Sequence, residues 1–248
     1  MATEHTRGGN AVQTAMTQPL KAVAFDLDST LCHYALTVEE VIERALERVG
    51  FSDPRIGKFD ELAAEYNAAW CKAEEELRLP TEELRRAAWT RILNGRGAAD
   101  EAAALSIADA YSEIRRETGI RLFDGVPSLL DDLRARYRTG ILTNGPSDMQ
   151  WEKLTKLNLA DAVDAIVVAG DLGIFKPDPR PFLQLLDRLE ATPAQSIFVG
   201  DSFEHDITGA RRVGMRTVWI RSNGKAENPD WTPNHVLRHV EDLRGILL

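Results

Sequence analysis

Hydrophobic positions in the first half of the chain change from a continuous run to helical spacing. Residues 21–25 read Lys-Ala-Val-Ala-Phe, a short apolar run that predicts a buried strand. From residue 37 to residue 118, apolar residues recur every three or four positions, in segments separated by Gly or Pro. This spacing predicts helices, and no strand pattern interrupts them. Helices are expected over about 37–49, 58–79, 81–93 and 100–117.

Capping residues mark the ends of these predicted helices. Thr37 followed by Glu40 matches a capping box, and Gly50 is a suitable stop for the first helix. Thr81, which follows Pro80, is expected to cap the third helix. The segment is therefore expected to form a small antiparallel bundle inserted after the first strand.

From Phe123 onward, short apolar runs alternate with helical segments. Strands are expected at 139–143, 165–169, 196–199 and 216–220, with a short edge strand at Val236. Helices are expected at 126–137, 149–157, 179–189, 207–213 and 241–247. This alternation implies a parallel sheet with helices on both faces. The predicted fold class is α/β, a Rossmann-like doubly wound parallel sheet with an inserted all-α helical bundle.

The same patterns divide the chain into three parts. Residues 1–18 are polar and contain Gly8-Gly9-Asn10, which is typical of a disordered leader. Residues 19–34 and 119–248 are predicted to form the α/β core domain, and residues 35–118 the inserted helical domain. A length of 248 residues suits one large domain with an insertion.

Composition narrows the partners and the compartment. A formal net charge of −9 disfavours nucleic acid as a partner. No apolar stretch is long enough to span a membrane, and the N-terminus has no apolar signal core. Cys32 and Cys71 have no metal-ligand spacing and suit a reducing compartment, with Cys32 expected to be a buried structural thiol. A cytoplasmic protein with no membrane partner is expected.

Candidate chemistry is concentrated where the predicted strands end. Loops at the carboxyl ends of parallel strands emerge on one edge of the sheet, so their polar side chains should meet. The first loop supplies Asp26 and Asp28, two carboxylates that repel each other and need a cation nearby. The later loops supply a hydroxyl, an amide, an amine and two further carboxylates: Thr143, Asn144, Lys176, Asp201 and Asp206.

This donor set indicates a magnesium and phosphate site. Carboxylates without His or Cys suit Mg²⁺, which prefers oxygen ligands and is often shared with substrate phosphate. Lys176 would balance the remaining negative charge, and Thr143 with the backbone N–H groups after it suits phosphate oxygens. Any single loop could be an ordinary turn or helix cap, and Asp178 and Ser202 are expected to be caps.

Four short motifs, in order, resemble those of the haloacid dehalogenase (HAD) superfamily of phosphohydrolases. They are Asp-Leu-Asp-Ser-Thr from Asp26, Leu-Thr-Asn-Gly from Leu142, Lys-Pro-Asp-Pro from Lys176 and Gly-Asp-Ser-(three residues)-Asp from Gly200. The resemblance covers nearly everything from residue 21 to residue 248. The inserted helices resemble the family's cap of the first type (C1), which closes over the active site.

The resemblance implies a role for each matching position. Asp26 would be the nucleophile that forms an aspartyl-phosphate, and Asp28 would protonate the leaving oxygen and then activate water. Lys176 would orient Asp26 and neutralise charge on the phosphoryl oxygens. Thr143, in the loop it shares with Asn144, would bind the phosphoryl group.

The resemblance also implies the metal ligands. Mg²⁺ would be held by Asp26, by the backbone carbonyl of Asp28 and by Asp201. Asp206 matches the second acid of the fourth motif, and would act as a ligand, through water, or by orienting its neighbours.

The resulting expectation is a Mg²⁺-dependent phosphomonoester hydrolase acting on a small phosphorylated metabolite. Asp28 disfavours a 2-haloacid dehalogenase, because halide leaves without a proton. A phosphomutase of sugar phosphates has the same motifs and stays open as an alternative. A non-catalytic phosphate-binding regulatory protein would be expected to show a damaged motif, and none is damaged. The substrate (nucleotide, sugar phosphate or phospho-acid) and the choice between monomer and homodimer stay open.

Specificity would depend on residues near the inserted helices. His33 and Tyr34 follow the first motif and could touch the substrate, although single loop residues of this kind are more often structural. Arg96 could reach an anionic substrate, or be a solvated loop residue. Trp70 and Trp89 fall at helical spacing and are expected in the core of the bundle.

Overall fold

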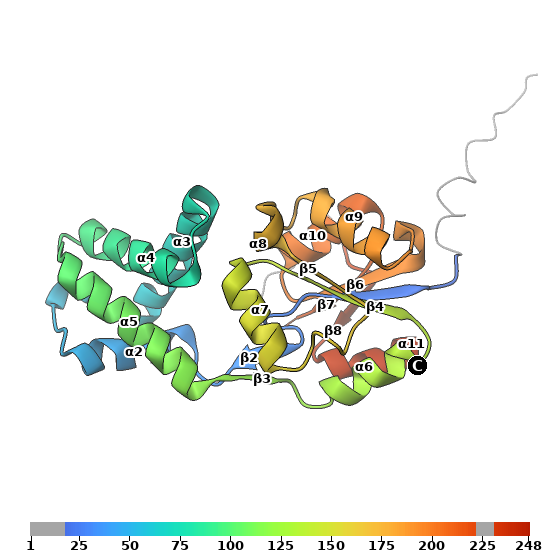
Figure 1. The fold of residues 1–248 in the computed structure, drawn as a ribbon, viewed down its shortest axis with the longest axis horizontal. Coiled ribbons are helices and arrows are strands. Elements are labelled where there is room, and N and C mark those ends of the chain that lie inside the picture. Colours follow the sequence, from blue (N-terminus) through green and yellow to red (C-terminus); the bar gives the residue numbers. More distant parts are fainter. Residues whose placement is uncertain (1–17, 222–230) are drawn as a thin grey trace, which may run out of the picture.

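The structure is a computed structural model that describes residues 18–221 and 231–248. Figure 1 shows a sheet with helices on both sides and, beside it, a separate group of helices. A two-stranded ribbon lies between these two parts of the molecule. The predicted leader, residues 1–18, falls outside the described residues except for Gln18.

The main sheet is parallel and has the strand order β5-β4-β1-β6-β7-β8. Its strands are β1 (Ala22–Phe25), β4 (Arg138–Thr143), β5 (Ala165–Val168), β6 (Ser196–Gly200), β7 (Arg216–Ile220) and β8 (His235–Leu237). β1 is buried over its whole length, because its residues are apolar and it pairs with β4 on one side and β6 on the other. The chain first winds outward through β4 and β5 and later through β6, β7 and β8. The carboxyl end of β1 is therefore at the switch point where open α/β sheets bind ligands.

Helices cover both faces of this sheet. They are α6 (Val126–Arg134), α7 (Ser147–Lys156), α8 (Ala169–Leu172), α9 (Pro179–Arg188), α10 (Thr208–Val213) and α11 (Arg244–Leu247). Phe25 of β1 belongs to a core that includes Leu129 of α6, whereas Ala24 belongs to a core that includes Phe182 of α9. Neighbouring β1 residues thus face opposite sides of the sheet, as the two-residue period of a strand requires. The predicted α/β fold class is confirmed.

The remaining helices form a unit with its own core. They are α2 (Val38–Val49), α3 (Phe59–Leu77), α4 (Thr81–Gly95) and α5 (Glu101–Thr118). Trp89 is fully buried in this unit, and its ring centroid lies 5.6 Å from that of Tyr66. The predicted capping box is present, since the Thr37 hydroxyl accepts from the Glu40 N–H while the Glu40 carboxylate accepts from the Thr37 N–H. The domain boundaries at residues 34/35 and 118/119 stay a prediction.

Two short strands that the sequence pattern does not predict border the helical bundle. β2 (Cys32–Tyr34) and β3 (Ile120–Leu122) pair in antiparallel fashion where the chain enters and leaves the bundle. Three-residue strands are too short to show an alternating pattern, so sequence periodicity cannot reveal them. The two chain segments that link the helical unit to the sheet therefore run side by side as one ribbon (Figure 1).

Helix ends also differ from expectation at several places. Thr81 is the first residue of α4 rather than its cap, and it bonds to Asp148 of α7 instead. The predicted final helix, 241–247, is a 3₁₀ turn (Val240–Leu243) followed by the short α11. Further short turns are Pro54–Ile56, Pro193–Gln195 and Phe203–Ile207. No helix of the described residues is long and apolar enough to cross a membrane.

Candidate active site

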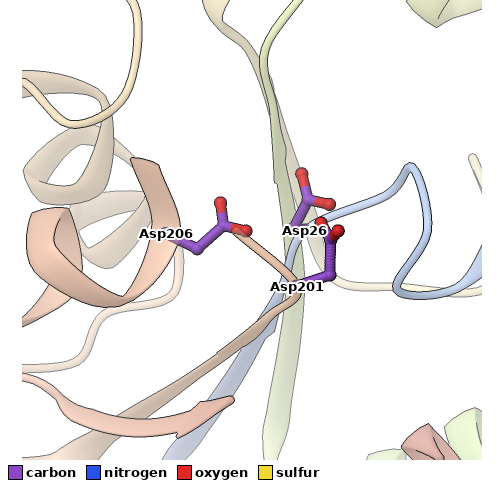
Figure 2. A group of neighbouring side chains, drawn as sticks. All are labelled: Asp26, Asp201 and Asp206. Carbon is purple, nitrogen blue, oxygen red and sulfur yellow. The ribbon is translucent and has the colours of Figure 1, made fainter. Parts of the chain in front are cut away.

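Three carboxylates meet at the carboxyl edge of the sheet. Asp26 directly follows β1, Asp201 directly follows β6, and Asp206 lies in the helical turn that comes after β6. One oxygen of each carboxylate lies within 4.8 Å of the others. Figure 2 shows the three side chains around one small volume beyond the strand ends. Asp26 and Asp206 are buried, and Asp201 is half-buried. The oxygen donors are the kind that a hard divalent cation prefers.

Lys176 joins two of these carboxylates. Its Nζ donates to Asp26 Oδ1 at 2.6 Å, to Asp206 Oδ1 at 2.7 Å and to the backbone carbonyl of Leu142 at 3.0 Å. Asn144 fixes the loop, because its side-chain amide bonds to both the N–H and the carbonyl of Lys176. Lys176 is only 3% exposed, so the charge of its ammonium group acts on the carboxylates with little screening by water.

Burial dominates the electrostatics of this cluster. Burial raises the pKa of Asp26 to about 8, and the charges of Asp206 and Asp201 add to the rise while Lys176 opposes it. Burial disfavours the charged form of Lys176, but the two carboxylates it contacts outweigh burial and raise its pKa. A bound cation would favour the ionised form of Asp26, which is the form that can act as a nucleophile.

Asp28 faces a different set of partners. Lys153 Nζ lies 2.8 Å from Oδ1 and 2.7 Å from Oδ2 of Asp28, and Gln150 Nε2 donates to Oδ2 at 3.2 Å. Both partners come from α7 and are buried. Sequence reasoning missed them, because their spacing of three residues places both on one face of the helix but does not show that this face is buried. The two acids of the first motif are thus each paired with a different buried lysine.

Thr143 and Asn144 lie at the carboxyl end of β4, as predicted. The Thr143 hydroxyl is buried and lies 3.1 Å from both the Asn144 carbonyl and Gln150 Oε1. The Asn144 amide is engaged by Lys176, so this residue holds the loop through its side chain. Gln150 therefore connects the second-motif threonine to Asp28.

Two turns around the cluster depend on local chemistry. Ser202 caps the turn after β6, since its hydroxyl accepts from the His205 N–H at 3.2 Å, and its own N–H donates to Asp206 at 2.9 Å. Gly200 allows Asp206 to come this close, because a Cβ at residue 200 would lie 2.4 Å from Asp206 Oδ2. Asp178 caps α9, as expected, by accepting from the Arg180 N–H.

A pocket of about 430 Å³ lies next to Asp28, between the helical unit and the sheet. His33 and Tyr34 line it, together with aromatic and basic residues of the bundle. Trp70 also lines it and is half-buried, so this tryptophan is not confined to the bundle core. Arg96 does not line it, because its guanidinium pairs with Glu65 and with backbone carbonyls inside the helical unit.

The fold and the site together define the class of protein. It is an α/β protein with an open parallel sheet, an inserted helical unit, and an acidic cluster with a buried lysine at the switch point, where a cation could bind. The sequence model of the haloacid dehalogenase-like hydrolases matches residues 20–214. The chain belongs to this family of hydrolases. The predicted superfamily is confirmed.

Two curated relatives agree with the predicted enzyme class, whereas one similar solved structure is named as a dehalogenase. A phosphoserine phosphatase of Thermus thermophilus is 34% identical over 166 residues, which is 66% of this chain and 64% of that protein. A glyceraldehyde 3-phosphate phosphatase of Methanopyrus kandleri is 29% identical over 92% of this chain and 97% of that protein. Among solved structures, a 2-haloacid dehalogenase of Pseudomonas syringae superposes with a TM-score of 0.64 at 29% identity, over 92% of this chain and 98% of that one.

Proposed function

We propose that the protein hydrolyses a small phosphorylated metabolite, with Mg²⁺, through an aspartyl-phosphate (acyl phosphate) intermediate on Asp26. One observation carries the proposal. Asp26 is held by Lys176 beside two further carboxylates, while Asp28, two residues later, is held apart from them by Lys153. Two acids with separate partners suit the two roles that phosphate ester hydrolysis needs, a nucleophile and a proton donor.

The cluster fits a hard divalent cation. Asp26 and Asp201 would hold it with the backbone carbonyl of Asp28, and Asp206 would act as a further ligand or orient Lys176. When bound, Mg²⁺ would supply positive charge to the phosphoryl oxygens, beside the ammonium of Lys176.

In the first step, a carboxylate oxygen of Asp26 attacks phosphorus in line. The bond from phosphorus to the leaving oxygen breaks, and Asp28, which enters this step protonated, gives its proton to that oxygen. In the second step, Asp28 takes a proton from water as the water oxygen attacks phosphorus. The bond from phosphorus to Asp26 breaks, which releases inorganic phosphate and restores the carboxylate. Thr143 and the backbone N–H groups after it would hold the phosphoryl oxygens.

The alternative reactions, dehalogenation and phosphoryl transfer to a sugar, place different demands on Asp28 and on the group that accepts the phosphoryl. A dehalogenase needs no proton donor for its leaving halide, so the buried partners that hold Asp28 favour a phosphate ester over a haloacid. The phosphatase names of the two relatives above point the same way. A phosphomutase would use the same residues, and differs only in whether a sugar hydroxyl or water accepts the phosphoryl group. We propose that the helical unit acts as the cap that covers the leaving group.

The test is hydrolysis of p-nitrophenyl phosphate with Mg²⁺. Asp26→Asn should lower kcat by about 10³-fold or more, and EDTA should abolish turnover of the wild type. Asp178→Asn is the matched control, because Asn also caps a helix and this acid lies outside the cluster. Wild-type turnover in Asp26→Asn, or full activity in EDTA, would contradict the proposal.

A further inference from the structure

The pocket beside Asp28 carries an excess of positive charge. Its lining includes the cationic side chains of Arg85, Arg115 and Lys153, whereas Asp28 is the one carboxylate among the described residues that line it. The chain as a whole has a formal net charge of −9, so this excess is local. A concave, cationic surface on an acidic protein favours an anionic ligand.

Lys153 and Arg85 already have partners. Lys153 bonds to both oxygens of Asp28. Arg85 is buried, with Tyr66 Oη at 3.4 Å, a carboxylate oxygen of Glu82 at 3.5 Å and the Ser112 hydroxyl in contact. These two cations add to the positive potential of the pocket, but their hydrogen-bonding groups are largely engaged.

Arg115 of α5 differs from both. Its guanidinium donates to the Leu36 carbonyl at 2.6 Å and to Tyr111 Oη at 3.0 Å, and its Cζ lies 4.3 Å from the centre of the Tyr34 ring. All these partners are neutral. No carboxylate in the described part of the chain lies within 4.0 Å of it, although the residue is half-buried. The exposed carboxylate of Glu40 also interacts electrostatically with Arg115. A half-buried guanidinium whose hydrogen-bond partners are all neutral can still direct positive charge at a ligand.

Tyr34 links this guanidinium to the acid of the first motif. Lys153 Nζ lies 5.3 Å from the centre of the Tyr34 ring, so the same ring is near both Arg115 and the ammonium that holds Asp28. Tyr66, Trp70 and Tyr111 complete an aromatic wall around the same space. A ligand that reaches from Asp28 to Arg115 would lay its carbon skeleton against these rings.

We propose that the leaving group of the substrate carries a second anionic group, a carboxylate or a phosphate, which Arg115 binds. The inference rests on the proposed function, because it takes the pocket beside Asp28 to be where the leaving group lies. Arg115 thereby selects acidic phosphate esters of a few carbons over neutral ones. Guanidinium pairs with carboxylate or phosphate by two parallel hydrogen bonds, which gives this selection its directionality.

Three esters of matched length test this in the wild type. Propane-1,3-diol monophosphate ends in a hydroxyl, 3-phosphooxypropanoate ends in a carboxylate, and propane-1,3-diol bisphosphate ends in a second phosphate. We expect kcat/KM with Mg²⁺ to be about tenfold or more higher for at least one anionic ester than for the neutral one. The faster of the two anionic esters identifies the group. Equal values for all three, or a preference for the neutral ester, would overturn the inference.

Arg115→Met tests the residue. We expect the ratio of kcat/KM between the anionic and neutral esters to fall toward one, through a higher KM for the anionic ester, and Arg115→Lys to keep part of it. Arg86→Met is the control, because Arg86 is exposed on α4, pairs with Asp109 and does not line the pocket. The ratio of kcat/KM between the anionic and neutral esters in this variant should equal that of the wild type. An unchanged ratio in Arg115→Met would assign the selection elsewhere and overturn the inference. If the wild type did not hydrolyse p-nitrophenyl phosphate, the proposed function itself would be overturned instead.

Discussion

Lys153 holds both carboxylate oxygens of Asp28, with its Nζ 2.8 Å from one and 2.7 Å from the other. Lys153 is 5% exposed, and Asp28 raises its pKa although burial works in the opposite direction. An ammonium at this depth keeps its charge only beside an anion. The pair therefore fixes the orientation of Asp28 in a position distinct from that of Asp26, which Lys176 holds.

Lys153→Met is expected to impair proton transfer more than phosphoryl transfer. Without the ammonium, Asp28 loses its fixed orientation, so kcat for an alkyl phosphate should fall by about tenfold or more. Release of p-nitrophenol in a single turnover should slow much less, because this leaving group departs without protonation, whereas the second step needs Asp28 for either ester. The measurement is the single-turnover rate of leaving-group release from both esters, with Lys156→Met as control, since Lys156 is exposed on the same helix and pairs with Glu152. An equal loss on both esters would show that Lys153 has only a structural role.

The sequence predicts the sheet well, but it does not predict the ion pair between Lys153 and Asp28. Strands such as Ala22–Phe25 are buried on both faces and read as unbroken apolar runs, so their order of appearance already implied the fold. Asp26 and Lys176 could be grouped because both follow predicted strands. Lys153 lies in the middle of α7, and nothing in a helical pattern says that a lysine faces inward rather than toward water. Its contact with Asp28 depends on how the helix packs across the sheet edge.

Removing Lys176 should lower the stability of the protein as well as its activity. Lys176→Met would leave Asp26 and Asp206 buried without the cation they share. We expect a loss of roughly 3–5 kcal/mol in the free energy of unfolding in EDTA, because breaking a buried ion pair leaves uncompensated charge. Mg²⁺ should return part of this stability by binding the same carboxylates. Thermal unfolding with and without Mg²⁺ measures both effects, and an unchanged melting temperature in EDTA would contradict the prediction.

The raised pKa of Asp26 predicts a pH dependence of stability in the metal-free protein. The pKa lies near 3.8 in the unfolded chain and at about 8 in the folded one, so the native state binds more protons between these values. Stability from this group is fully present below about pH 4 and is lost as pH rises toward about 8. The loss is on the order of a few kcal/mol, because one pKa unit corresponds to about 1.4 kcal/mol.

Asp26→Asn removes that titration while Lys176 keeps its contact with Asp206. In EDTA the variant should therefore lose less stability than the wild type between pH 4 and pH 8. Urea unfolding at several pH values measures the difference. Parallel pH profiles for the two proteins would show that Asp26 does not titrate in this range. The same proton competition predicts that Mg²⁺ affinity of the wild type rises with pH up to about 8.

The contact between Thr81 and Asp148 gives the last prediction. The Asp148 carboxylate accepts from the Thr81 N–H at 3.0 Å and from its hydroxyl at 2.9 Å, which ties the start of α4 to α7 across the two units. Asp148→Ala removes both bonds and should expose the first turn of α4 to faster hydrogen exchange, at a cost of about 1 kcal/mol in stability. If the helical unit covers the leaving group, KM should rise several-fold while the rate with saturating p-nitrophenyl phosphate changes little. Glu152→Ala, which removes an exposed pair on the same helix, should change neither quantity. Hydrogen exchange in α4 equal to that of the wild type would mean that other contacts hold the helical unit in place.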